Sequence, residues 1–191
     1  MLMTNLDNLF NYINSTDLLT TARAGGQLPI YLYAYPATQE DEMSDLIVGL
    51  KSRLTSAGKS VIHKDIFEMV VDILEDNDEF TSLLIVEPET PKWDVADHIN
   101  AVADFTDMVL PRIKEEIELN SSSVVFLSGI AKCYPFLRTK GIIEGLEIGL
   151  SDTPVVLFFP GTYDGWTMLL FGTVHEHSYR AINLSGQLDG K

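Results

Sequence analysis

The sequence predicts a single α/β domain over residues 1–191, with a mostly parallel sheet of about five strands flanked by helices, Rossmann-like but without a phosphate loop. Near-continuous apolar runs such as VVLFF at 155–159 are typical of strands buried on both faces. These runs alternate along the chain with segments of helical spacing, as in α/β proteins. A chain of 191 residues also buries roughly 70% of its unfolded surface, enough for one core.

The first half of the chain predicts two strands, each followed by a helix. Apolar residues at 6, 9, 10 and 13 indicate a short N-terminal helix, which TARAGGQLP at 21–29 ends. IYLYAY at 30–35 is the first strand, and a helix over 43–54 follows a capping box from Thr38 to Asp41. SVIHKDI at 60–66 is the second strand. Asp65, with Glu68 three residues on, caps a helix over 66–74 that the acidic stretch EDNDE at 75–79 ends.

The second half predicts three more strands. Residues 81–94 show no regular pattern, and a longer helix follows over 95–109, which Pro111 kinks or interrupts and Ile113 and Ile117 extend. SSSVVFLSG at 121–129 is the third strand, and residues 136–150 form a helix. TPVVLFFPG at 153–161 is the fourth strand and YRAINL at 179–184 the fifth. Functional sites on such a sheet lie just beyond the carboxyl ends of its strands.

Composition and charge exclude several classes of protein. One cysteine provides no disulfide framework, the N-terminus lacks a basic leader, and no apolar run approaches the roughly 20 residues of a membrane helix. We therefore expect a cytoplasmic protein with no membrane association. The net charge of −15, from 28 acidic and 13 basic residues, repels nucleic acid, so we expect no direct DNA binding by this chain alone.

The usual catalytic and cofactor motifs are incomplete. GKS at 58–60 precedes a strand and has arginine where a phosphate loop needs its first glycine, so Gly58 is interpreted as a helix cap. Cys133 is interpreted as a small buried thiol, and HEH at 175–177 as a turn without further metal ligands. Three glycines at 141, 145 and 149 indicate a helix that approaches a neighbour closely. We expect no catalytic residue, metal or cofactor.

The loops after the third and fourth strands carry the candidate site. SGIAKCYPFLR at 128–138 and FFPGTYDGW at 158–166 emerge at the same edge of a parallel sheet, where Arg138 and Asp164 can meet. The alternative is an ordinary structural Arg–Asp pair. The candidate partner-binding residues are Lys132, Tyr134, Arg138, Tyr163, Asp164 and Trp166.

The same segments resemble a known family. YPFLR at 134–138, FFPGTYDGW at 158–166, LFG at 170–172 and YRA at 179–181 are similar to BrxB, the small component of bacteriophage-exclusion (BREX) defence systems. The N-terminal helix, LPIYLYAY at 28–35 and the length are also similar to that family, whereas the acidic stretch over 75–97 has no matching feature. The resemblance implies no established activity. It implies partners among the other BREX proteins: a PglZ-family alkaline-phosphatase-like protein, a large ATPase and a DNA methyltransferase.

Two functional hypotheses follow. The first is a non-enzymatic adaptor that helps to assemble a BREX complex through the C-terminal strand edge and its loops. The second is a degenerate nucleotide-binding or hydrolytic domain whose site uses Arg138 and Asp164.

Overall fold

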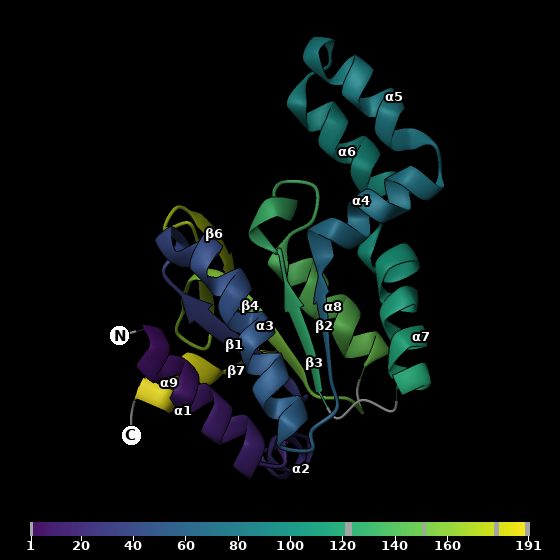
Figure 1. The fold of residues 1–191 in the computed structure, drawn as a ribbon. Coiled ribbons are helices and arrows are strands. Elements are labelled where there is room, and N and C mark those ends of the chain that lie inside the picture. Colours follow the sequence, from purple (N-terminus) through teal and green to yellow (C-terminus); the bar gives the residue numbers. More distant parts are fainter. Residues whose placement is uncertain (1, 121–123, 151, 178–179, 190–191) are drawn as a thin grey trace.

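A mixed sheet of seven strands lies between two layers of helices in the computed structural model, which describes residues 2–120, 124–150, 152–177 and 180–189 (Figure 1). The strands are β1 (Ile30–Tyr35), β2 (Val61–Asp65), β3 (Val124–Ser128), β4 (Val155–Tyr163), β5 (Thr167–Leu170), β6 (Val174–His177) and β7 (Ile182–Asn183). The helices are α1 (Leu2–Ser15), α2 (Leu18–Ala24), α3 (Glu40–Ser56), α4 (Ile66–Asp76), α5 (Glu79–Val86), α6 (Lys92–Val102), α7 (Leu110–Asn120), α8 (Thr139–Gly149) and α9 (Leu184–Asp189).

The sheet combines a parallel part with an antiparallel extension. Strands β2, β3, β4, β1 and β7 lie side by side in that order and pair in parallel. Beyond the parallel part, β4 continues to Tyr163 and the chain folds back as β5 and β6, which pair antiparallel. The prediction of a mostly parallel sheet is therefore wrong. Strands β5 and β6 alternate between more and less buried residues, so they lack the continuous apolar run that indicates a strand buried on both faces.

Burial on both faces explains the apolar run of β4. Val155, Leu157 and Phe159 pack in the core that α4, α7 and α8 cover. Val156 and Phe158 point to the opposite face and pack in the core formed with α1, α3 and α9. All five side chains are fully buried, as the sequence predicts.

Several local predictions are confirmed. Asp65 caps α4, because its Oδ1 accepts hydrogen bonds from the backbone N–H groups of Phe67 (2.9 Å) and Glu68 (3.2 Å). Gly58 follows α3 with a left-handed backbone (φ 89°) and is a helix cap instead of part of a phosphate loop. Cys133 is fully buried, and burial raises the pKa of its thiol, which disfavours the reactive thiolate.

Two of the three regularly spaced glycines of α8 lie close to side chains of a neighbouring segment. A Cβ on Gly145 would lie 2.7 Å from the Phe105 ring, and one on Gly149 would lie 2.4 Å from a methyl group of Leu110. Among the described residues, no atom other than those of its chain neighbours and of the α8 backbone lies within 4 Å of a Cβ placed on Gly141. The expected close approach is therefore confirmed at residues 145 and 149, where α8 packs against the segment that leads into α7.

Helix boundaries depart from the predictions in the middle of the chain. Residues 81–94, expected to be irregular, contain most of α5, a 3-10 turn over Glu87–Glu89 and the start of α6. The expected long helix breaks at Ala103, upstream of Pro111, because Asp104 caps a π-helical turn over Phe105–Val109 that leads directly into α7. Ile113 and Ile117 lie in α7, as expected.

Other boundaries also differ. The capping box at Thr38 does not form: α3 begins after a 3-10 turn over Ala37–Gln39, and its N-cap Gln39 makes no side-chain capping bond. The fifth predicted strand is reduced to the two residues of β7, because α9 begins at Leu184. Residues 121–123 of the third predicted strand and residue 179 of the fifth lie outside the described residues.

Candidate functional site

A hollow of about 560 Å³ lies where β1, β4 and β7 reach their carboxyl ends. Its polar groups are largely held by the fold. The Asn183 amide donates to the Tyr163 carbonyl (2.7 Å), and the Ser185 hydroxyl donates to the Ala34 carbonyl (3.1 Å) and accepts from its N–H (2.6 Å). The hollow therefore has fixed walls. Its lining comprises residues 34–38, 161–163, 171, 172, 183, 185 and 186.

The antiparallel extension of β4, β5 and β6 forms one side of this hollow and carries an exposed aromatic residue in each of its two turns. Trp166, between β4 and β5, is 55% exposed, and Phe171, between β5 and β6, is 46% exposed. Gly161 lets the strands pair tightly, since a Cβ there would lie 2.2 Å from the Leu169 carbonyl oxygen. We call the two turns, residues 164–166 and 171–173, the hairpin turns.

Asp164 shapes the first hairpin turn. Its Oδ1 accepts hydrogen bonds from the backbone N–H groups of Thr167 (2.7 Å) and Trp166 (2.8 Å). These bonds favour the carboxylate and lower the pKa of Asp164. The Trp166 ring lies over the imidazole of His177, with 6.3 Å between ring centroids. The turn thus presents an aromatic side chain on a fixed backbone.

Tyr163, predicted to bind a partner, is instead buried, with 6% of its surface exposed. Its hydroxyl donates to the Ala181 carbonyl (2.8 Å) and joins β4 to the residue before β7. Burial raises the pKa of Tyr163 to about 12. The hydroxyl is thus engaged within the fold, and little of the side chain is left exposed for a partner.

The residues predicted on the β3–α8 segment lie in two small clusters. Lys132 forms an ion pair with Asp65 (Nζ to Oδ2, 3.0 Å), and although burial opposes its charge, this hydrogen bond raises the pKa of Lys132 overall. The Arg138 guanidinium lies over the Tyr134 ring, 5.8 Å from its centroid. Among the described side chains Arg138 forms no ion pair with Asp164, so the predicted contact between the two loops is not made.

The hairpin is nevertheless attached to the start of α8. The backbone N–H of Lys140 donates to the Glu176 carboxylate of β6 (3.1 Å). HEH at 175–177 is therefore part of a strand, and the interpretation as a turn is wrong. The sequence carries no clear signal for this strand, because its four residues are partly exposed and are held by pairing with β5.

Sequence reasoning also missed a serine–histidine contact between β2 and β3. His63 Nε2 lies 2.8 Å from Ser128 Oγ, and burial lowers the pKa of His63. Ser128 is 7% exposed. Within the described part of the chain no carboxylate is hydrogen-bonded to His63, so the pair lacks the orienting third group of a catalytic triad.

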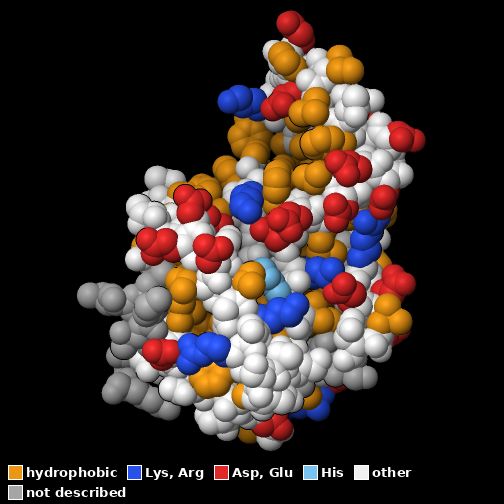
Figure 2. All heavy atoms as spheres, viewed as in Figure 1, with side chains coloured by type: hydrophobic (Ala, Val, Ile, Leu, Met, Phe, Trp, Pro, Cys, Tyr) orange, Lys and Arg blue, Asp and Glu red, His pale blue; other side chains and the backbone are white. Residues whose placement is uncertain are grey.

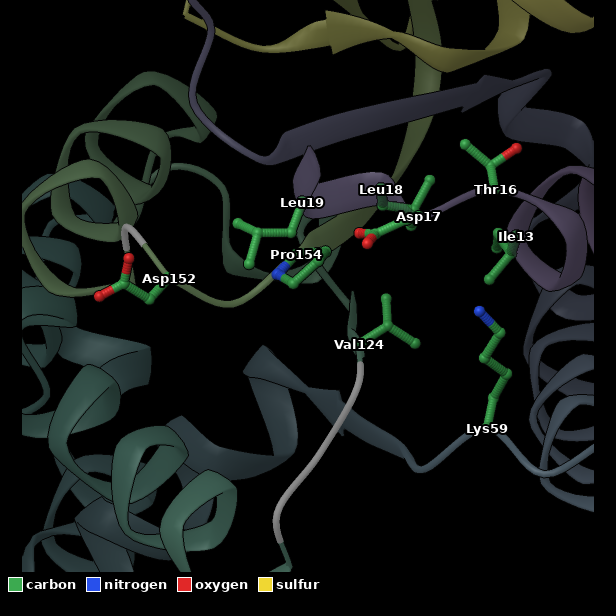
Figure 3. Close-up of a pocket in the computed structure, with 9 residues that line it drawn as sticks. All are labelled: Ile13, Thr16, Asp17, Leu18, Leu19, Lys59, Val124, Asp152 and Pro154. Atoms are coloured by element: carbon green, nitrogen blue, oxygen red, sulfur yellow. The ribbon is translucent and has the colours of Figure 1, made fainter. Parts of the chain in front are cut away.

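A second hollow, of about 380 Å³, lies at the opposite edge of the sheet (Figure 3). It is bordered by the end of α1, the start of α2 and the residues that enter β2, β3 and β4, and Lys59 extends into it. Asp17 is the N-cap of α2. It accepts a hydrogen bond from the backbone N–H of Thr20, and this bond lowers the pKa of Asp17. Asp152 is ion-paired with Arg23. Both carboxylates of this hollow are thus engaged in contacts within the chain. The candidate site is therefore the first hollow, at the carboxyl ends of the parallel strands.

Comparison with known proteins identifies the family. The family model of BREX protein BrxB matches residues 62–184, which include every strand from β3 to β7 and both hairpin turns. The chain belongs to the BrxB family. Two BREX proteins BrxB are similar along nearly their whole length: that of Bacillus cereus (strain H3081.97) is 27% identical over 184 residues, covering 94% of this chain and 95% of the relative. That of Escherichia coli O9:H4 (strain HS) is 25% identical over 186 residues, covering 94% and 89%.

Family membership confirms the resemblance drawn from YPFLR and FFPGTYDGW, and it places the chain in the BREX phage-defence systems. No solved structure matches the chain, so the Rossmann-like comparison stays a prediction. Over the residues that the structure describes, every helix is too short or too polar to cross a membrane.

Proposed function

We propose that this BrxB-family chain is a non-enzymatic adaptor that helps to assemble a BREX complex through its hairpin turns. The observation that carries the proposal is the pair of exposed aromatic residues, Trp166 and Phe171, on turns held by Asp164 and by the attachment of β6 to α8. Aromatic side chains on a fixed backbone are the residues that most often dominate protein–protein interfaces.

The partners in this proposal are other BREX proteins in the cytoplasm. The PglZ-family protein is the first, and the large ATPase and the DNA methyltransferase are further partners. Contact with DNA is assigned to these partners, because the net charge of −15 opposes phosphate binding by this chain. Lys132, Tyr134 and Arg138 lie on the segment between β3 and α8, to which the hairpin is attached, and they extend the proposed surface.

Capture of partners from a host that carries the whole BREX operon tests the adaptor role. We expect tagged wild-type protein to capture the PglZ-family protein, and the variant Trp166→Ser/Phe171→Asn to capture far less and to lose phage protection. Asn is chosen because Phe171 has a left-handed backbone (φ 54°) that Asn tolerates. The matched control is Leu119→Ser/Ile148→Asn, which removes two hydrophobic side chains that are 76% and 80% exposed on α7 and α8. Equal capture by the two variants contradicts the proposal.

Thermal unfolding with ligands separates the adaptor from a nucleotide-binding or hydrolytic domain. A ligand that binds only the folded protein raises the melting temperature. We expect no rise with nucleotides, divalent metals or their combinations. A rise that disappears in Arg138→Ala or Asp164→Ala would support the second hypothesis instead.

A further inference from the structure

Helices α5 and α6 form a lobe that projects beyond the sheet on the side of α4 (Figure 1). We call Glu79–Val102 the helical lobe. An apolar groove of about 190 Å³ runs between the lobe and α4. Phe67 and Leu74 border it from α4, Leu84 and Glu87 from the α5 side and Ile99 from α6, and Phe136 also lines it. The acidic stretch for which the sequence showed no family feature is thus the wall of a groove.

The helical lobe exposes large hydrophobic side chains at high density. Four of the nine that are exposed among the described residues lie within ten positions. They are Leu84 (55% exposed), Ile85 (72%), Val86 (48%) and Trp93 (60%). Because α5 ends in four consecutive apolar residues, Leu83–Val86, this end is apolar on almost every side, and Leu83 alone among the four is buried against the core. A helix of this kind is typical of a surface that another protein covers.

Acidic residues surround this apolar surface. Between residues 75 and 98 lie eight of the chain's 28 acidic residues but only one of its 13 basic residues. Asp76 pairs with Arg112 and Glu79 with His98. The other six form no ion pair with a described side chain: Glu75, Asp78, Glu87, Glu89, Asp94 and Asp97. Figure 2 shows hydrophobic side chains gathered over the lobe with acidic side chains around them.

We propose that the acidic-rimmed groove binds a basic amphipathic helix of a partner protein. Its apolar face fills the groove beside Leu84, and its Lys and Arg side chains pair with the carboxylates of the rim, Glu87 first. The charge of the rim selects this occupant. Nucleic acid and anionic membranes are repelled, and a second copy of this chain brings the same excess of carboxylates. The proposal rests on the adaptor function and adds a second surface, remote in sequence from the hairpin turns.

Titration of the purified chain with a synthetic helix tests the groove. The probe is a fluorescent 14-residue peptide of Leu and Lys with an amphipathic pattern, and its control has Glu in place of each Lys. We expect the Lys peptide to bind the wild-type chain at least tenfold more tightly than the Glu peptide does. Its affinity should fall as salt is added, because salt screens the charges of the rim. Absence of binding by the Lys peptide, or equal binding of the two peptides, overturns the proposal.

Matched variants locate the binding. Leu84→Ser/Glu87→Lys changes two groove residues, and Leu119→Ser/Glu118→Lys makes the same two changes near the far end of α7. We expect the first variant to lower the affinity for the Lys peptide at least tenfold and the second variant to lower it less than twofold. An equal loss in both variants overturns the groove as the site. Melting temperatures are measured alongside, and Glu87→Lys alone, with Glu118→Lys as its control, replaces the two double variants if Leu84→Ser melts early.

Partner capture distinguishes failure of this inference from failure of the adaptor function. The peptide titration uses the isolated chain, so its result does not depend on other BREX proteins. If the wild-type chain captures BREX proteins and Leu84→Ser/Glu87→Lys captures them equally, the groove proposal is wrong and the adaptor function stands. If the wild-type chain captures none, the adaptor function is wrong whatever the peptide does.

Discussion

Substitution of the α8 glycines by alanine measures how closely this helix packs against its neighbour. In Gly145→Ala the new Cβ would lie 2.7 Å from Cδ1 of Phe105 and 3.1 Å from Oγ1 of Thr106. Phe105 is 3% exposed and lies in the π-helical turn that Asp104 caps, so its ring has little room to move. Overpacking of this kind costs about 1–3 kcal/mol, against a gain of about 1 kcal/mol in helix propensity.

Gly141 is the matched control, because apart from its chain neighbours and the α8 backbone no described atom lies within 4 Å of a Cβ at that position. We expect Gly141→Ala to stabilise the protein by about 0.5–1 kcal/mol and Gly145→Ala to destabilise it by about 1 kcal/mol. Urea unfolding of the two variants and the wild type measures the difference, and each 1 kcal/mol changes the melting temperature by about 2–4 °C in a chain of this size. If Gly145→Ala proves as stable as Gly141→Ala, the close packing of α8 is wrong.

Three further substitutions test the carboxyl edge. Gly129→Ala places a Cβ 1.9 Å from Oδ1 of Asp65, at a residue with a left-handed backbone (φ 75°). We expect urea unfolding to show a free energy of unfolding lower by at least about 2 kcal/mol. An unchanged free energy would refute the geometry of this turn. Tyr163→Phe leaves the buried Ala181 carbonyl without its donor and should cost about 1–3 kcal/mol by the same measurement; no loss would mean that the hydroxyl is not needed there. Burial lowers the pKa of His63, so near and below about pH 6.5 the unfolded chain binds more protons than the folded chain. The free energy of unfolding of the wild type should therefore fall between pH 7.5 and pH 5.5, and by more than that of His63→Gln. Parallel pH profiles would show that His63 does not titrate as described.

The strands buried on both faces were predictable because their signal is local. VVLFF in β4 and IYLYAY in β1 are short, apolar throughout and rich in β-branched and aromatic residues, which is typical of strands buried on both faces. The Asp65 cap was equally local, since an N-cap depends on residues two and three positions away.

The rest depended on contacts between distant residues. Strands β5 and β6 are half-exposed and exist because β5 pairs with β4 and β6 pairs with β5, which neither short segment indicates by itself. The burial of Tyr163 follows from its bond to residue 181, and the engagement of Lys132 follows from its bond to residue 65. Of the candidate site, the sequence predicted the loops and the exposed Trp166, but not the hollow, Phe171 or the groove beside α5.

The most direct test of the central claim is the affinity between this chain and the PglZ-family protein of the same operon, measured by titration of the two purified proteins. We expect the wild-type chain to bind and Trp166→Ser/Phe171→Asn to bind roughly thirtyfold more weakly, because truncated aromatic anchors commonly cost about 2 kcal/mol or more. Leu119→Ser/Ile148→Asn should bind within about twofold of wild type, since its two side chains lie outside the hairpin turns. Absence of binding by the wild-type chain, or equal affinity for the two variants, would contradict the account.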